Sequence, residues 1–242
     1  MSKRALRTAR TGSEARHFLD GVSLNRSMPL RDQIYAVLRR SIVTRELPPG
    51  AMINEFEIAA RLGNSRTPVR EAVKKLSDEG LIDVLAQSGT FVAEIDRAQV
   101  EEAYIVRIAL ECESVARAAP LMSDEHLQNL EDIIDRHKVA LARDRFDEAI
   151  ARDDDFHRYI TQISGLAMLW RVVDTCKAQM DRCRMLTVPR PGHGTLTIEQ
   201  HRAIVAALAT RKPRAAIAAL RAHLDTSLGN SLSWFDERDS GK

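Results

Sequence analysis

Cysteines are few in this chain, and none of them form a close pair. The 242 residues include three, Cys112, Cys176 and Cys183, with no CxxC motif. An odd number without a close pair favours reduced, buried thiols in a cytoplasmic protein, with a redox-sensing cysteine as the alternative.

Long apolar runs and a large net charge are also missing. No stretch approaches the roughly 20 apolar residues that a membrane span needs, and the N-terminus lacks the apolar core of a signal peptide. The net charge of +2 excludes a diffuse polycation, and no repeat or low-complexity segment is present. With 44% hydrophobic residues, the chain suits two modest domains with real cores.

Positive charge is instead concentrated in one stretch. Residues 61–75 contain five basic residues and one acid. Screening removes distant contributions within about 10 Å at ordinary salt, so contacts with phosphates depend on local fields of this kind.

The same stretch carries the pattern of two short helices joined by a tight turn. The first helix is expected from Glu55 to Leu62, with Asn54 as its N-cap. Gly63-Asn64 suits the turn because both residues tolerate left-handed backbone. Ser65 can cap the second helix, in which an early proline costs little.

The second helix has one apolar face and one basic face. Val69, Val73 and Leu76 recur at helical spacing and form the expected buried stripe. The outward residues of its N-terminal half are those expected to contact DNA, as in a recognition helix that enters the major groove: Arg66, Thr67, Arg70 and Lys74.

A hairpin is expected to follow this helix. Residues 81–85 and 90–93 look like strands around a tip at Gln87-Ser88-Gly89, where Gly89 lets the backbone approach a phosphate or a minor groove. An earlier helix is expected at residues 30–44. The whole is a winged helix-turn-helix over residues 29–95, preceded by a basic arm over residues 1–28 that is solvated or, alternatively, grips DNA. Helix-turn-helix packing used only for protein contacts is the alternative to DNA binding.

From residue 96 to residue 235 the pattern is helical throughout. Thr197 to Gln200 fits a capping box. The fold class is therefore mainly α, a winged helix-turn-helix followed by an antiparallel all-α bundle, with a tail at 236–242. The expected bundle helices are 97–118, 123–143, 146–163, 168–185, 197–210 and 213–232.

Charged and imidazole groups interrupt the apolar stripes of this bundle. Asp153 and His157 lie one turn apart on the inward face of their helix, and His201 lies on an inward face of another. His201 and His223 are equidistant from Lys212 in the turn between two antiparallel helices, so these imidazoles should face each other. Nitrogen and oxygen ligands of this kind suit a divalent ion such as Zn, Ni or Mn, with satisfied core histidines as the alternative.

Four segments resemble the DNA-binding domain of GntR-family bacterial transcription regulators: LPPG, INEFEIAARLG, SRTPVREAVKKLSDEGLI and SGTFVAE. The resemblance implies base and phosphate contacts at Arg66, Thr67 and Arg70, with Gly89 in the wing. Relatives often have an arginine where this chain has Phe56, a departure that bears on which operator sequence is read.

The segments DDDFHRYI and EQHRAIVAAL, with AALRAHL after them, resemble the FCD effector domain of the FadR-type branch of the same family. Metal-binding members use an Asp and a His four apart and two later histidines, which match Asp153, His157, His201 and His223. The resemblance also implies a small carboxylate effector, and relatives place an arginine near it at the position of Arg107. The alternative for Arg107 is an ion pair with Glu111.

The expected function is a ligand-responsive transcription regulator that binds a palindromic operator as a homodimer in the cytoplasm. No membrane partner is expected. The alternative is a metal-dependent enzyme that uses the Asp/His cluster for hydrolysis, although no inward general base of the HExxH kind is evident.

Overall fold

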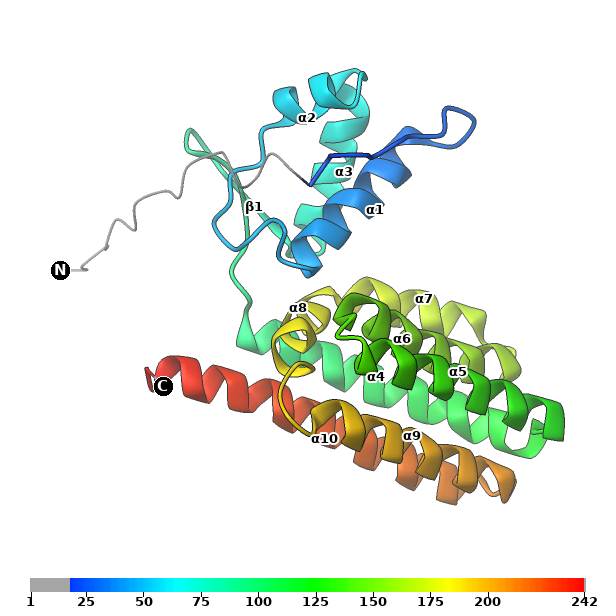
Figure 1. Ribbon diagram of the computed structural model, residues 1–242. Coiled ribbons are helices and arrows are strands. Elements are labelled where there is room, and N and C mark those ends of the chain that lie inside the picture. Colours follow the sequence, from blue (N-terminus) through cyan, green and yellow to red (C-terminus); the bar gives the residue numbers. More distant parts are fainter. Residues whose placement is uncertain (1–17, 242) are drawn as a thin grey trace. The chain divides into compact units, whose positions relative to one another are not determined.

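The computed structural model describes residues 18–241, and its elements are labelled in Figure 1. They form two compact units, which divide between Glu94 and Ile95. Residues 1–17, most of the expected basic arm, lie outside the described residues. The predicted fold class is confirmed.

The first unit is a helix-turn-helix followed by a hairpin. Its helix α3 packs against both α1 and α2 (Figure 1). The side chain of Asn54 accepts hydrogen bonds from the backbone N–H groups of Phe56 and Glu57, which confirms the predicted cap. Ser65 occupies the N-cap position of α3, but its side chain makes no capping hydrogen bond. The elements are α1 (Leu30–Val43), α2 (Glu55–Arg61), α3 (Arg66–Asp78), β1 (Ile82–Leu85) and β2 (Gly89–Val92).

The wing is a short antiparallel hairpin with a third segment along one edge. β1 and β2 pair from Ile82 with Val92 to Leu85 with Gly89. The chain before α2 continues the pairing, since Ile53 N–H donates to Thr90 O at 2.8 Å. The wing is thereby tied to the start of α2.

The core of the first unit joins α1 to α3. Ile34, Leu38 and Ile42 of α1 are fully buried, as is Leu76 of α3. Tyr35 Oη donates to Glu79 at 2.7 Å, and Lys75 Nζ lies 3.7 Å from the centre of the Tyr35 ring. These contacts hold the C-terminal end of α3 and leave its N-terminal half outward.

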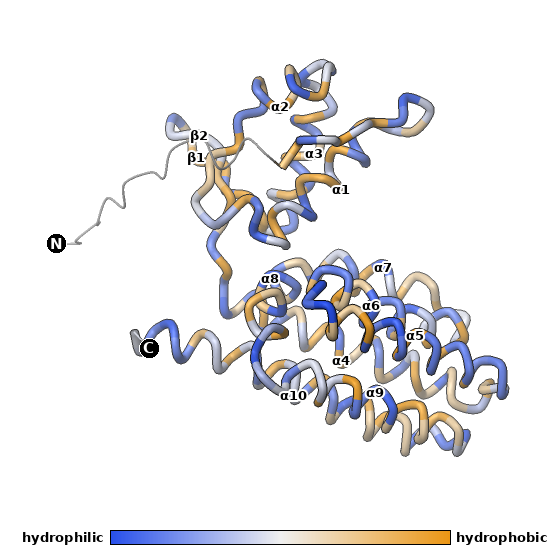
Figure 2. The backbone as a smooth tube through the Cα atoms, viewed as in Figure 1, coloured by the Kyte–Doolittle hydropathy of each residue, from blue (hydrophilic) through white to orange (hydrophobic). Residues whose placement is uncertain are grey.

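The second unit is all helical. Figure 2 shows hydrophobic and hydrophilic residues alternating along its helices, the pattern of helices with an apolar stripe and a polar face. α10 packs against α4 and α9, and α5 packs against α6 and α9. No helix among residues 18–241 is both long and apolar enough to cross a membrane. The elements are α4 (Arg97–Ala118), the short 3-10 helix η2 (Ala119–Leu121), α5 (Asp124–Ala142), α6 (Phe146–Ile163), α7 (Ala167–Cys176), α8 (Ala178–Thr187), α9 (His193–Ala209) and α10 (Pro213–Asp239).

The helix expected at residues 168–185 is two helices, α7 and α8, which separate at Lys177. The Lys177 side chain is buried, and its Nζ lies 2.6 Å from Asp154 Oδ2 and contacts Asp181. Burying an ammonium is costly unless it is paired, and these carboxylates supply the pairing. The apolar pattern of the sequence does not reveal this break.

Two helix ends also differ from the expectation. α9 begins at His193, so the capping box predicted at Thr197 is wrong: the Thr197 hydroxyl donates to His193 O at 3.1 Å from inside the helix. α10 continues to Asp239, into the expected tail, because Phe235 is fully buried in a small core with Tyr104 and Met180.

The three cysteines are free. Cys183 is buried, and burial raises the pKa of its thiol to about 11. Cys112 is half-buried and Cys176 is exposed, so the expectation of buried thiols is wrong for Cys176.

Candidate DNA-binding helix and candidate metal centre

The N-terminal half of α3 presents basic side chains to solvent. The side chains of Arg66 and Arg70 are 56% and 66% exposed, and Thr67 and Lys74 are exposed as well. Val69 and Val73 on the opposite face are buried. The helix therefore has the two faces that its sequence predicts.

The wing carries a glycine at the start of β2. Gly89 has a φ of +122°, which side-chain-bearing residues rarely adopt. A Cβ at this position would lie 3.4 Å from the Phe91 ring. Phe56, which stands where relatives often have an arginine, is 68% exposed in the first turn of α2.

The structure brings together the Asp and the three His residues that the sequence singles out. Asp153 and His157 come from α6, His201 from α9 and His223 from α10, and each is at most 3% exposed. One potential ligand atom from each lies within 4.8 Å of the others. The imidazoles of His201 and His223 face each other with ring centres 4.8 Å apart, as their equal distance from the turn predicts.

The outer edges of two of these imidazoles are held by neighbouring polar groups. Nδ1 of His157 lies 2.6 Å from Glu111 Oε2, and Nδ1 of His223 lies 3.0 Å from Gln200 Oε1. Such partners fix the ring orientation and leave Nε2 to face inward. The inward Nε2 of His157 lies 3.7 Å from Asp153 Oδ2, and that of His201 lies 3.3 Å from Asp153 Oδ1.

The charge states of these groups suit a metal ligand set. Burial lowers the pKa of His201 and lowers that of His223 further, so both rings are neutral near pH 7. Burial alone would raise the pKa of Asp153, but Arg184 and the nearby imidazoles hold it well below its usual range. Neutral imidazole and carboxylate are the forms that bind a cation.

Unsatisfied nitrogens test whether a metal fits here. Nε2 of His157 and both ring nitrogens of His201 are buried without a hydrogen-bond partner among the described residues. Buried polar atoms without partners are costly, and a cation contacting His157, His201, His223 and Asp153 would satisfy one on His157 and one on His201. The residues therefore fit a divalent ion.

Arg107 is buried beside this cluster. Its Nε donates to Glu111 Oε1 at 2.5 Å, its Nη1 lies 3.8 Å from Met180 Sδ, and its Nη2 lies 3.7 Å from Asp153 Oδ2. Burial alone would raise the pKa of Glu111, but Arg107 and His157 lower it to about 2. The ion pair with Glu111 that the sequence allowed is present.

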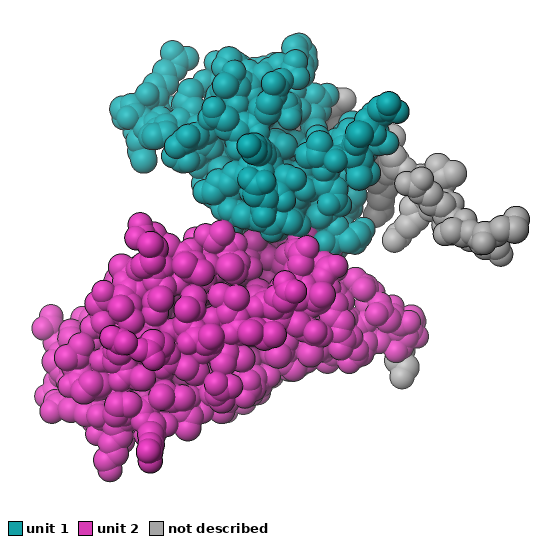
Figure 3. All heavy atoms as spheres, turned by 180° about the vertical axis from the view of Figure 1, so that it is seen from behind, with its two compact units in different colours: residues 1–94 teal, residues 95–242 magenta. Residues whose placement is uncertain are grey.

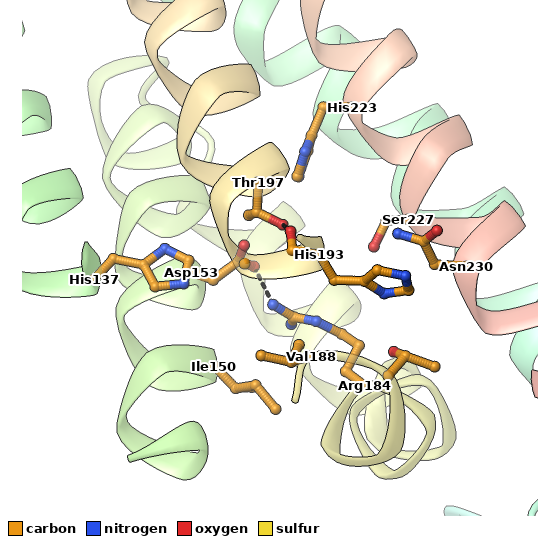
Figure 4. A pocket seen from close by; sticks show the side chains of 12 residues that line it. His137, Ile150, Asp153, Arg184, Val188, His193, Thr197, His223, Ser227 and Asn230 are labelled. Atoms are coloured by element: carbon orange, nitrogen blue, oxygen red, sulfur yellow. Dashed lines mark hydrogen bonds and ion pairs between the residues drawn. The ribbon is translucent and has the colours of Figure 1, made fainter. Parts of the chain in front are cut away.

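A polar cavity of about 30 Å³ adjoins the cluster at Asp153 and His223 (Figure 4). Arg184 of α8 projects into it, and its Nη2 lies 2.6 Å from Asp153 Oδ2. Hydroxyl, amide and imidazole groups supply much of the remaining wall: Thr187, Thr197, Ser227, Asn230, His137 and His193.

Sequence reasoning missed Arg184 and His137. His137 is 3% exposed, and burial lowers its pKa to about 4. Its ring lies 5.7 Å from that of His201, and its Nδ1 has no hydrogen-bond partner among the described residues. Arg184 lies in a helix whose many polar residues suggest solvent exposure, so only its position in the fold identifies it.

Comparison with known proteins places each unit in a family. The profile of bacterial regulatory proteins of the gntR family matches residues 30–92, in the first unit, and the FCD domain profile matches residues 102–226, in the second (Figure 3). The HTH-type transcriptional repressor RspR of Escherichia coli K12 is 35% identical over 201 residues, which cover 83% of this chain and 88% of that protein. The Nta operon transcriptional regulator of Aminobacter aminovorans is 30% identical over 187 residues, covering 75% of this chain and 85% of the relative.

Solved structures agree on the fold. E. coli McbR/YncC superposes with a TM-score of 0.74 at 22% identity, over 86% of this chain and 99% of that one. A GntR regulator from Rhodococcus sp. RHA1 gives 0.71 at 22% identity, over 84% of this chain and 97% of that one. The chain belongs to the GntR family of bacterial regulatory proteins and carries an FCD domain. It is a transcription regulator and not an enzyme, so the hydrolase alternative is not borne out.

Proposed function

We propose that this chain is a cytoplasmic regulator of the FadR-type branch. It binds a palindromic operator as a homodimer and responds to a small carboxylate effector beside a metal ion in its FCD domain. The observation that carries the proposal is the buried Asp/His cluster next to a polar cavity in the second unit, in a chain whose first unit presents an arginine-lined helix.

Operator contacts fall on one exposed surface of the first unit. Arg66 and Arg70 can donate two parallel hydrogen bonds to guanine edges, while Lys74 contributes charge toward phosphates. Thr67 offers a hydroxyl at the start of α3, where backbone N–H groups favour phosphate. The wing approaches the DNA backbone at Gly89, whose φ of +122° would strain a residue that bears a side chain.

A homodimer is supported by exposed apolar side chains on α4 and α7, two helices that pack against each other. Ile105 of α4 is 65% exposed, and Met168 and Val172 of α7 are also exposed. Twofold symmetry would place two recognition helices on the two half-sites of an inverted repeat.

The variant Ile105→Glu, Val172→Glu is expected to weaken self-association at least tenfold, since it would bury carboxylates in an apolar interface. Sedimentation velocity over a concentration series measures this. Val139→Glu is the matched control, because it adds a charge at an exposed apolar residue of α5. Dissociation caused by the control alone would place the interface on α5 instead.

The cavity suits a small acid that carries hydroxyl groups. Bound metal would supply a Lewis acid for one carboxylate oxygen, and the Arg184 guanidinium can take the carboxylate through two hydrogen bonds. Ser227, Thr197 and Asn230 can bind hydroxyl groups. A cavity of about 30 Å³ holds only two or so water molecules, so an acid must move its walls or displace Asp153 from Arg184. Effector binding is therefore coupled to helix positions.

The two arginines near the site are expected to differ in their roles. Arg184→Lys keeps the charge but loses the paired hydrogen bonds, so the affinity for an acid should fall roughly 10- to 100-fold, on the scale of about 1.5–3 kcal/mol for a charged hydrogen bond. Arg107→Lys should change it less, because Arg107 is paired with Glu111 behind the cluster. The measurement is the rise in melting temperature with a panel of two- to six-carbon acids, each hydroxy acid beside its deoxy analogue.

Metal content must stay at the wild-type level in both variants for this comparison to hold. If Arg107→Lys abolishes the response and Arg184→Lys does not, Arg107 is the effector contact that the family resemblance implies. Equal responses to hydroxy acids and their deoxy analogues would show that the polar wall does not select the ligand.

The whole proposal is tested by gel shift with the protein's own promoter region. The duplex should be bound by the metal-loaded protein, and a stabilising acid should change operator affinity by 5- to 150-fold, about 1–3 kcal/mol of coupling. By reciprocity, operator DNA should change acid affinity by the same factor. An acid that binds tightly without changing operator affinity would show that acid binding in the second unit does not regulate DNA binding.

A further inference from the structure

One carboxylate lies between the two exposed arginines of α3. Glu55 is the first residue of α2, and its side chain is only 20% exposed. Its Oε2 lies 3.9 Å from Arg66 Nη2 and 3.7 Å from Arg70 Nε. A single oxygen of the neighbouring helix therefore contacts both guanidinium groups.

The backbone that carries this carboxylate is well fixed. The Asn54 side chain accepts hydrogen bonds from the N–H groups of Phe56 at 3.1 Å and Glu57 at 3.2 Å, so both bonds span residue 55. Ile53, just before the cap, donates its N–H to Thr90 in the wing. Hydrogen bonds of the Asn54 cap and of the hairpin thus fix the backbone around Glu55, whereas the two arginine side chains extend into solvent.

Without this carboxylate, little would restrain the two guanidinium groups. They belong to residues four apart on one helix face, and like charges at this spacing repel. Long exposed side chains also populate many rotamers, and fixing them costs conformational entropy when DNA binds. An acid that contacts both reduces their repulsion and limits the rotamers that they sample.

On charge alone, a carboxylate at a phosphate-binding surface weakens the binding of any DNA. Its position between two proposed base-reading side chains offsets this loss of affinity only if it orients those side chains toward the bases. We infer that Glu55 is a positioning residue that orients Arg66 and Arg70 toward base edges, so that it raises discrimination between sequences and lowers affinity for non-cognate DNA. The inference rests on the proposed DNA contacts of these two arginines.

A positioning role for Glu55 and a purely electrostatic role predict opposite changes in the affinity for the best DNA sequence when Glu55 is replaced by Gln. If Glu55 only contributes negative charge, Glu55→Gln should tighten the binding of every duplex by a similar factor. If it positions the arginines, the same change should weaken the best sequence and leave a scrambled duplex equally or more tightly bound. The ratio of the two affinities is therefore the quantity to measure.

The probes are a duplex enriched from a random pool by the wild-type protein and a scrambled duplex of the same length and composition. Fluorescence anisotropy of the full-length protein at several salt concentrations gives both affinities. Glu55→Gln is expected to bind the enriched duplex about tenfold more weakly and the scrambled duplex up to a few-fold more tightly. Glu71→Gln, which removes an exposed carboxylate from α3 itself, is the matched control and should leave the ratio unchanged.

Glu55→Asp separates positioning from a role at the helix end. Aspartate keeps the negative charge that stabilises the start of α2 but is one methylene shorter. Its melting temperature should match the wild type, while its loss of discrimination should resemble that of Glu55→Gln. In an Arg70→Ala background, Glu55→Gln should have a smaller effect on the ratio, because one of its two partners is gone.

A wild-type affinity ratio in both Glu55 variants would overturn the inference. That result leaves the proposed function intact as long as Arg66→Ala and Arg70→Ala still weaken the enriched duplex. If those two substitutions have no effect either, the recognition-helix assignment itself fails, and the two failures are thereby distinguished.

Discussion

His201→Ala is expected to lose bound metal and to melt at a markedly lower temperature. Purified wild-type protein should carry about one divalent ion per chain, and His201 supplies one of the four proposed ligands. Binding to the folded state alone stabilises it by about 4.1 kcal/mol at a thousandfold excess over Kd. For a unit of this size each kcal/mol shifts the melting temperature by roughly 2–4 °C. The expected loss is therefore roughly 8–16 °C, with His223→Ala behaving similarly.

Packing must be separated from metal loss in this experiment. The Phe156 ring stacks on His201 with centres 4.1 Å apart, so the alanine variant also loses apolar contact. His137→Ala is the matched control, because it removes a buried imidazole beside His201 that is outside the proposed ligand set. It should retain the metal.

Chelation gives the second arm of the test. Stripping the metal from wild-type protein should lower its melting temperature by nearly the same amount, while chelator should not change the His201→Ala variant further. Elemental analysis of protein prepared without chelator supplies the occupancy. An empty site in that preparation would favour the alternative in which the four residues are a satisfied polar core.

Much of this candidate centre could be predicted from helical periodicity. Asp153 and His157 replace apolar residues on a face whose neighbours are buried, and α6 has the expected bounds. The facing of His201 and His223 followed from their equal spacing about the turn at Lys212, since antiparallel neighbours pair residues equidistant from their connection. Such inferences work where a helix is regular and amphipathic.

The same reasoning fails in α7 and α8. Residues that look solvated there, among them Lys177, Asp181 and Arg184, are buried. Lys177 and Arg184 can be buried because they pair with Asp153 and Asp154 of α6, more than 20 positions away in sequence. Asp181 in turn pairs with Lys177 and Arg184. Periodicity reports the apolar face of one helix, but a buried ion-pair network depends on partners from other elements. Periodicity therefore singled out Arg107, but the arginine that lines the cavity is Arg184.

The double substitution Arg66→Ala, Arg70→Ala is expected to abolish most sequence-specific DNA binding. A good bidentate contact with a base contributes roughly 1–3 kcal/mol of discrimination, so losing two weakens the operator complex by about 2–6 kcal/mol if they act independently. Both side chains are more than half exposed, so the free energy of unfolding should change by no more than about 0.5 kcal/mol. Gel shift on the enriched duplex and a thermal melt measure the two quantities.

Loss of charge alone would also weaken binding, but in a different manner. Arg31→Ala removes an exposed arginine from α1 of the same unit and should leave operator affinity within a few-fold. Substitutions of base-reading residues lower the affinity for the enriched duplex more than for a scrambled one, whereas lost phosphate contacts lower both and reduce the salt dependence. If the double variant binds the enriched duplex as tightly as the wild type, α3 is not the recognition helix. Its basic face would then contact another protein, which is the alternative to DNA binding for this helix-turn-helix.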